Sequence, residues 1–125
     1  MRIIVGSAAA LVLASIYAAP LFPASYLAFG AVCHQAPERC FAWLGRPLPV
    51  CARCLALYTG VLLAALGPAW RPHVRLLALF AILNAVDWLF GLATNETRFL
   101  LAFPLFWLSA SYLLALASRE RAASN

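Results

Sequence analysis

The sequence predicts an all-α integral membrane protein with about four transmembrane helices and a cysteine-rich cap loop between the first and the second. The prediction rests on the composition and on the alternation of apolar segments with short polar turns. Of the 125 residues, 66% are hydrophobic and only 10% are charged. Soluble domains average about 45–50% apolar and about 25% charged residues. We therefore expect one membrane domain, residues 1–125.

Four apolar segments are candidate spans, each near the lower end of the roughly 17–25 residues that cross a bilayer. They cover approximately residues 3–20, 54–70, 76–94 and 99–118. The stretches RPHVR and NETR are too short for domains, which predicts tight turns between antiparallel helices. A signal peptide is the alternative for the first segment. Its positive region has only Arg2 and IYAAP is a poor cleavage site, so we interpret it as a helix.

The arginines predict how the chain is oriented in the membrane. With four spans, the N-terminus, the RPHVR turn and the C-terminal tail share one side and carry five of the nine arginines. Because cytoplasmic segments are enriched in basic residues, this favours cytoplasmic termini and an external cap. The arginines form no basic stripe, so we expect no nucleic-acid partner. The expected partners are the lipid bilayer and other membrane subunits or further copies of this chain.

All four cysteines lie in one polar window, CHQAPERCFAWLGRPLPVCARC, which is the predicted cap loop of residues 33–54. Zinc in proteins takes four cysteine and histidine ligands, and a CxxC motif supplies two of them. The window therefore predicts a metal site, with Cys51 and Cys54 as two ligands. The remaining ligands would come from Cys33 or His34 together with Cys40.

The CxxC motif is expected at the start of a helix. Pro47 and Pro49 keep the preceding residues out of the helical region, and an apolar helical run follows. Free N–H groups at a helix N-terminus favour a thiolate, and Arg53 inside the motif adds positive charge. Both metal binding and disulfide exchange require a thiolate.

Other interpretations of the window stay open. Two cysteine pairs on a small four-helix membrane protein resemble a quinone-coupled thiol–disulfide oxidoreductase, in which Cys33 and Cys40 would be the shuttle pair. Two structural disulfides could instead staple an external loop. Iron is the alternative to zinc, since an iron–sulfur cluster also uses four thiolates. No nucleotide-binding loop, HExxH or GxSxG motif is present, so no catalytic residue is predicted.

The motif CHQ-x-PER followed by LPVCARC resembles a family of small bacterial and archaeal predicted membrane proteins of unknown function. The resemblance continues through Asp87 and the turn TN-x-x-R, and covers about residues 30–105. It implies no known activity. The family usually has serine in place of Cys40, which implies that Cys40 is not an essential ligand. His34 then either completes the shell or orients a ligand. The resemblance marks four residues: Cys33, His34, Cys51 and Cys54.

Asp87 is the only acid within an apolar span. A carboxylate in the membrane is costly and usually faces the bundle interior with a partner. Asn95 continues the line of Asp87 towards the next helix, and we expect it to be the N-cap of that helix. Such a polar centre is either an ion pair that fixes helix packing or a site used by a transporter. Its predicted members are Arg53, Asp87, Asn84, Asn95 and Arg98.

Overall fold

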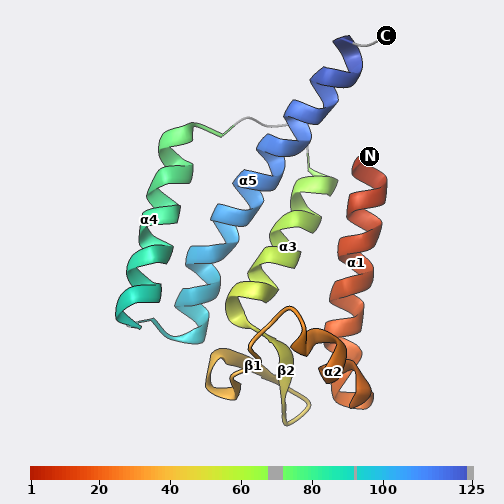
Figure 1. The fold of residues 1–125 in the computed structure, drawn as a ribbon, viewed down its shortest axis with the longest axis vertical. Helices are drawn as coiled ribbons and strands as arrows, with labels where there is room; N and C mark the ends of the chain where they lie inside the picture. The colour runs from red at the N-terminus through yellow and green to blue at the C-terminus, as the bar shows by residue number, and fades with distance from the viewer. Residues whose placement is uncertain (68–71, 92, 124–125) are drawn as a thin grey trace.

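In a computed structural model of the protein, the described chain forms a bundle of long helices with a small cap at one end (Figure 1). The structure describes residues 1–67, 72–91 and 93–123, with side chains to residue 120. The bundle helices are α1 (Arg2–Ala18), α3 (Ala52–Leu66), α4 (Val74–Phe90) and α5 (Asn95–Ala123). The cap contains η1 (Ala19–Leu21), α2 (Ala24–Gly30), η2 (Pro37–Arg39), β1 (Cys40–Trp43) and β2 (Arg46–Cys51).

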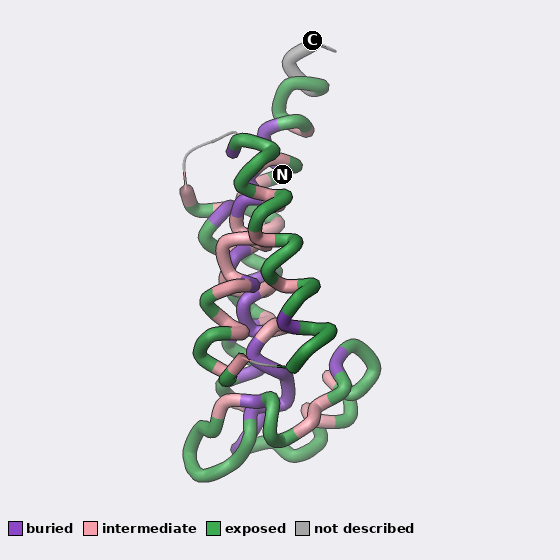
Figure 2. Tube along the Cα trace, turned by 90° about the vertical axis from the view of Figure 1, so that its left-hand side faces the viewer, coloured by how far each residue is buried: buried purple, intermediate pink, exposed green. Residues whose placement is uncertain are grey.

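The bundle helices lie in a row. Helix α3 stands between α1 and α5, and α4 packs on the far side of α5 (Figure 1). The N-terminus and the C-terminal end of α5 lie at one end of the bundle. The cap, the last turn of α4 and the first turn of α5 lie at the other end. Figure 2 shows the buried residues running up the middle of the bundle and into the cap.

Within the described part of the chain, two helices are long and apolar enough to cross a membrane. They cover Arg2–Leu21 and Asn95–Glu120, and Ala52–Leu66 is a shorter apolar helix. The four-span assignment therefore stays a prediction. The segment predicted over residues 76–94 ends as a helix at Phe90, because Gly91 has a φ of 62° and a left-handed residue stops a helix. Residues 68–70 of the predicted second span lie outside the described residues.

The all-α prediction is wrong for the cap, which contains a two-stranded antiparallel sheet. Leu44 and Gly45 connect β1 to β2 with φ angles of 52° and 74°. Two positive φ angles are the mark of a type I′ turn, whose twist matches that of a two-residue hairpin. An irregularity in the register follows Cys40, and the pairing places Cys40 opposite Cys51.

Small residues let α3 approach α5 closely. A Cβ atom added to Gly60 would lie 2.8 Å from the backbone nitrogen of Trp107. Ala56 and Ala102 are fully buried. Helices that approach this closely gain backbone packing that larger side chains would prevent.

Arg2 joins the start of α1 to the end of α3. Its guanidinium donates to the carbonyl oxygen of Ala64 at 2.8 Å and to that of Gly67. The last carbonyls of a helix lack partners within the helix, and a basic side chain can bind them. The first residue of α1 and the last turn of α3 therefore lie at the same level of the bundle.

Candidate metal centre

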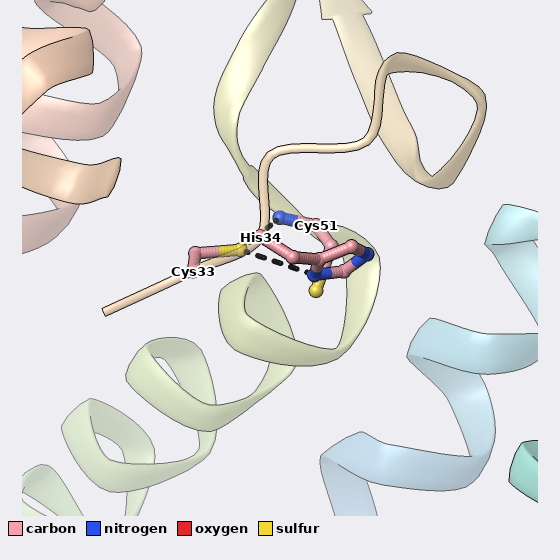
Figure 3. A group of neighbouring side chains, drawn as sticks. All are labelled: Cys33, His34 and Cys51. Atoms are coloured by element: carbon pink, nitrogen blue, oxygen red, sulfur yellow. Dashed lines mark hydrogen bonds between the residues drawn. The ribbon is translucent and has the colours of Figure 1, made fainter. Parts of the chain in front are cut away.

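Three potential metal ligands meet where the cap joins α3. The Sγ atoms of Cys33 and Cys51 and a ring nitrogen of His34 all lie within 4.8 Å of one another. Figure 3 shows the three side chains gathered beside the first turn of α3. Both sulfurs belong to buried residues, whereas His34 is exposed. An ion held here would be shielded on the sulfur side and accessible on the imidazole side.

The backbone around Cys51 explains this position. Proline holds β2 extended up to Cys51, which is the N-cap of α3 with φ −71° and ψ 164°. The backbone N–H of Cys51 donates to the Sγ atom of Cys33 at 3.2 Å. That sulfur is also 3.9 Å from Nδ1 of His34 (Figure 3). The free N–H group at the start of α3 thus holds Cys33, 18 residues earlier in the chain, next to the CxxC motif.

Gln35 holds the ligand-bearing loop in place. It has a φ of 50°, and its Nε2 atom donates to the carbonyl oxygens of Tyr26 at 2.7 Å and Pro49 at 3.0 Å. The Tyr26 hydroxyl in turn donates to the carbonyl of Pro47 at 2.6 Å. These bonds join α2, the loop that carries Cys33 and His34, and β2. The sequence analysis did not single out Gln35, although it is the third residue of the CHQ motif.

The other two cysteines lie outside the group of three. Cys54 is half-buried in the first turn of α3, and its thiol hydrogen-bonds Cys51. Cys40 is buried on β1, and its thiol donates to the carbonyl oxygen of Ala36 at 3.2 Å. All four cysteines, each of them described, are free thiols. Cys54 therefore contacts one member of the group of three, Cys51, without belonging to the group.

The pKa of the Cys51 thiol is lowered, whereas the pKa of the Cys40 thiol is raised. Hydrogen bonds from the Cys54 thiol, the Cys54 backbone, the Cys33 thiol and the Arg53 backbone lower the pKa of Cys51 from 9.0 to about 5. Burial, followed by repulsion from Cys33, Cys51 and Glu38, raises the pKa of Cys40 to about 11. At neutral pH, Cys51 is therefore ready to bind a cation and Cys40 is protonated.

The donor set fits a transition metal. Thiolate and imidazole ligands together suit zinc and iron. With zinc bonds of about 2.3 Å to sulfur and about 2.0 Å to nitrogen, the tetrahedral ligand atoms of this set would stand roughly 3.5–3.8 Å apart. The separations of up to 4.8 Å therefore require these side chains to move inward by about 1 Å.

Asp87 of α4 forms charged contacts with two other helices. Its carboxylate forms an ion pair with Arg53 of α3, and its Oδ2 atom is 3.7 Å from Nε of Arg98 on α5. The Oδ1 atom accepts a hydrogen bond of 3.0 Å from the backbone N–H of Ala93. Of the 17 residues of α4, all described, only Asp87 is buried. These contacts match what a buried carboxylate needs.

The two asparagines predicted for the polar centre, Asn84 and Asn95, donate hydrogen bonds to backbone carbonyl oxygens. Asn84 donates to the carbonyl oxygens of Phe80 at 2.8 Å and Leu101 at 2.9 Å, which joins α4 to α5. Asn95 donates to the carbonyl oxygen of Cys40 at 3.1 Å, which joins α5 to β1. The prediction that Asn95 caps α5 is wrong, because Asn95 is the first residue of the helix. The hydroxyl of Thr94 caps instead, accepting from the N–H of Thr97 at 3.4 Å.

Comparison with known proteins places this site in a family. Residues 33–115 match the family described as "Predicted membrane protein (DUF2085)". The chain belongs to this family. The matched region begins at Cys33 and contains the whole cysteine window and the polar centre.

Two archaeal relatives are similar to this chain. The uncharacterized protein MJ1492 of Methanocaldococcus jannaschii is 35% identical over 105 residues, which cover 71% of this chain and 65% of that protein. An uncharacterized protein of Methanothermobacter thermautotrophicus is 47% identical over 32 residues, covering 26% of this chain and 29% of that protein. The chain thus spans less than two thirds of the length of these relatives. No solved structure matches the chain.

Proposed function

We propose that this membrane protein binds one transition-metal ion, zinc, through Cys33, His34 and Cys51, with Cys54 as the fourth ligand. The observation that carries the proposal is the convergence of three ligand atoms within 4.8 Å, contributed by two segments far apart in the sequence. The lowered pKa of Cys51 supports it, because a thiolate is the form that binds metal.

The proposed role of the ion is structural. It would join the segment after α2 to the entrance of α3, where the described cap has only a two-stranded sheet and short helices to hold its shape. Small units of this kind commonly need a metal or other cross-link to be stable. The protein would then act as a small subunit of a membrane assembly.

For the membrane topology, we propose four crossings, by α1, α3, α4 and α5, within a single domain. The antiparallel row of helices supports this proposal. In the sequence, the N-terminus, the RPHVR turn and the C-terminal tail carry five of the nine arginines, which favours cytoplasmic termini.

Elemental mass spectrometry of detergent-purified protein tests the metal site. We expect about one zinc ion per chain in the wild type, loss of the ion in Cys51→Ser, and retention in Cys40→Ser. The two cysteines are matched in burial, each with 6% of its surface exposed, so the comparison separates a ligand from a buried thiol. Protein purified without chelator that holds no stoichiometric metal would contradict the proposal, as would equal loss in both variants.

A thiol–disulfide oxidoreductase is the second candidate, favoured by the acidic Cys51 thiol and its contact with Cys54. In that reaction, two thiols would form a disulfide, and their two electrons and two protons would reduce a quinone to a quinol. Thiol counting after incubation with a soluble quinone distinguishes the candidates. Loss of two thiols per chain with formation of quinol would support the oxidoreductase, and an unchanged count would support the metal site.

A further inference from the structure

The cap exposes large apolar side chains although it lies at the end of the bundle. All seven residues of α2 are described, and none of them is buried. A water-exposed cap would be expected to bury such residues, since large apolar patches mark binding surfaces. The exposed side chains have between 47% and 83% of their surface accessible, and they are Leu21, Phe22, Leu27, Val32, Trp43 and Leu44.

The lengths of the helices place the entrance of α3 deeper in the bundle than the end of the first span, Leu21. Arg2 fixes the start of α1 level with the end of α3 through the carbonyl oxygens of Ala64 and Gly67. From that level, the 20 residues to Leu21 extend about 30 Å, which matches the hydrocarbon thickness of a bilayer. The 15 residues of α3 extend only about 22 Å. The entrance of α3 therefore lies roughly 8 Å short of the end of the first span.

Side-chain packing agrees with this estimate. Cys33 and Cys51 belong to one buried cluster with Leu13 and Ile16, which lie in the last two turns of α1. Trp43 of β1 also packs edge-on against Tyr17 of α1, with ring centroids 5.7 Å apart. The cysteines thus lie beside the apolar span of α1 and not beyond its end.

We propose that the cap is embedded in the boundary between lipid headgroups and acyl chains, with α2 and the β1–β2 turn facing the lipid. The lipid is the partner that fits, because the exposed side chains are apolar and the aromatic rings of Tyr17 and Trp43 suit the membrane interface. Exposed charges at Glu38, Arg39 and Arg46 would meet the headgroups. The cysteine cluster then lies at the depth of the interface, nearer the lipid than an external loop would be.

Tryptophan quenching in reconstituted phosphatidylcholine vesicles tests this proposal. Emission of wild type minus that of Trp43→Phe reports Trp43 alone. We expect phospholipids with bromine near the start of the acyl chains to remove more than half of this difference, and aqueous iodide to remove little. Glu120→Trp in the Trp43→Phe protein provides the matched control, because residue 120 is exposed near the end of α5 and iodide should quench it strongly.

The outcomes separate lipid from other surroundings. Strong quenching of Trp43 by iodide but not by brominated lipid would overturn the proposal in favour of an aqueous cap. Quenching by neither would overturn it in favour of a covering protein, such as a second copy of this chain. Leu27→Trp in the Trp43→Phe protein repeats the test on α2. The same measurements on Cys51→Ser, which lacks a proposed metal ligand, test the position of the cap independently of the metal site.

Discussion

Arg53 lies between Cys51 and Cys54 in the first turn of α3, and its side chain forms an ion pair with Asp87 on α4. The backbone N–H of the same arginine hydrogen-bonds the Cys51 sulfur. One residue therefore contacts both the candidate metal centre and the buried carboxylate. Asp87, although not a candidate ligand, is thus linked to the cysteine motif through the Arg53 ion pair.

Replacing Asp87 with asparagine is expected to destabilise the bundle by about 3 kcal/mol. Removing one partner of a buried pair leaves an uncompensated charge, which costs roughly 3–5 kcal/mol. The lower end applies here because the Arg53 side chain is 24% exposed. Thermal unfolding of purified protein in detergent, followed by circular dichroism, measures the loss.

Two further variants give this experiment its controls. Glu120→Gln removes an exposed acid from the end of α5 and should leave the unfolding temperature unchanged. Asp87→Asn combined with Arg53→Gln should cost less than the sum of the two single changes, because the second removes the charge that the first left unpaired. Additive losses would show that the two side chains do not stabilise each other.

Gly60→Ala is expected to weaken the packing of α3 on α5. The new methyl group would lie 2.8 Å from the Trp107 backbone nitrogen, so the helices must separate, at a cost of about 1–3 kcal/mol. Gly30→Ala is the matched control, since its nearest neighbour would be a Gln35 side-chain atom at 3.6 Å, an ordinary van der Waals distance. Unfolding temperatures in detergent measure both changes. Equal temperatures for the two variants would contradict a tight α3–α5 contact.

Apolar runs made the bundle predictable, and the cap departed from their pattern. Each long helix corresponds to an apolar segment, because a chain in lipid must satisfy its backbone hydrogen bonds within the segment. The hairpin carries no such signal. Such turns are usually recognised from the dipeptide Asn-Gly or Asp-Gly. This turn is Leu44-Gly45, and a leucine with a φ of 52° is not expected from the sequence.

Part of the candidate site could also be predicted from the sequence. The prolines before Cys51 predicted an extended approach to a helix, and the structure has β2 running directly into α3. Distances between Cys33, His34 and Cys51 could not be predicted, since they depend on how the hairpin folds back. The positioning role of Gln35 depends on its contacts with Tyr26 and Pro49, whose spatial proximity the sequence does not specify.

Gln35→Met should weaken metal binding by about tenfold. The substitution keeps the side-chain length but removes both hydrogen bonds that hold the loop of Cys33 and His34 to its surroundings. Loss of a group that orients metal ligands typically lowers affinity by about 10- to 100-fold. Competition with a chelator of known affinity measures the change. Glu38→Gln, an exposed residue of the same loop, should bind as wild type does, and equal affinity in Gln35→Met would rule out this role.

Alkylation of metal-free protein should distinguish Cys51 from Cys40 by their pKa values. At pH 7, a thiol with a pKa of about 5 is almost entirely thiolate, whereas one with a pKa of about 11 is ionised in roughly one molecule in 10⁴. The more acidic thiolate is the weaker nucleophile, which reduces the advantage to about 20-fold. Iodoacetamide should therefore modify Cys51 about 20 times faster, as measured by fragment-ion mass spectrometry.

The alkylation rates of the two cysteines should depend on pH in different ways. The rate at Cys51 should rise as pH increases through about 5 and then stay level, while the rate at Cys40 should still be rising at pH 9. The two thiols are equally buried, so unequal access does not explain a difference in rate. Zinc added before the reagent should protect Cys51 and leave Cys40 unchanged, because only Cys51 belongs to the ligand group. Equal rates at pH 7 would mean that the hydrogen bonds to Cys51 do not stabilise its thiolate.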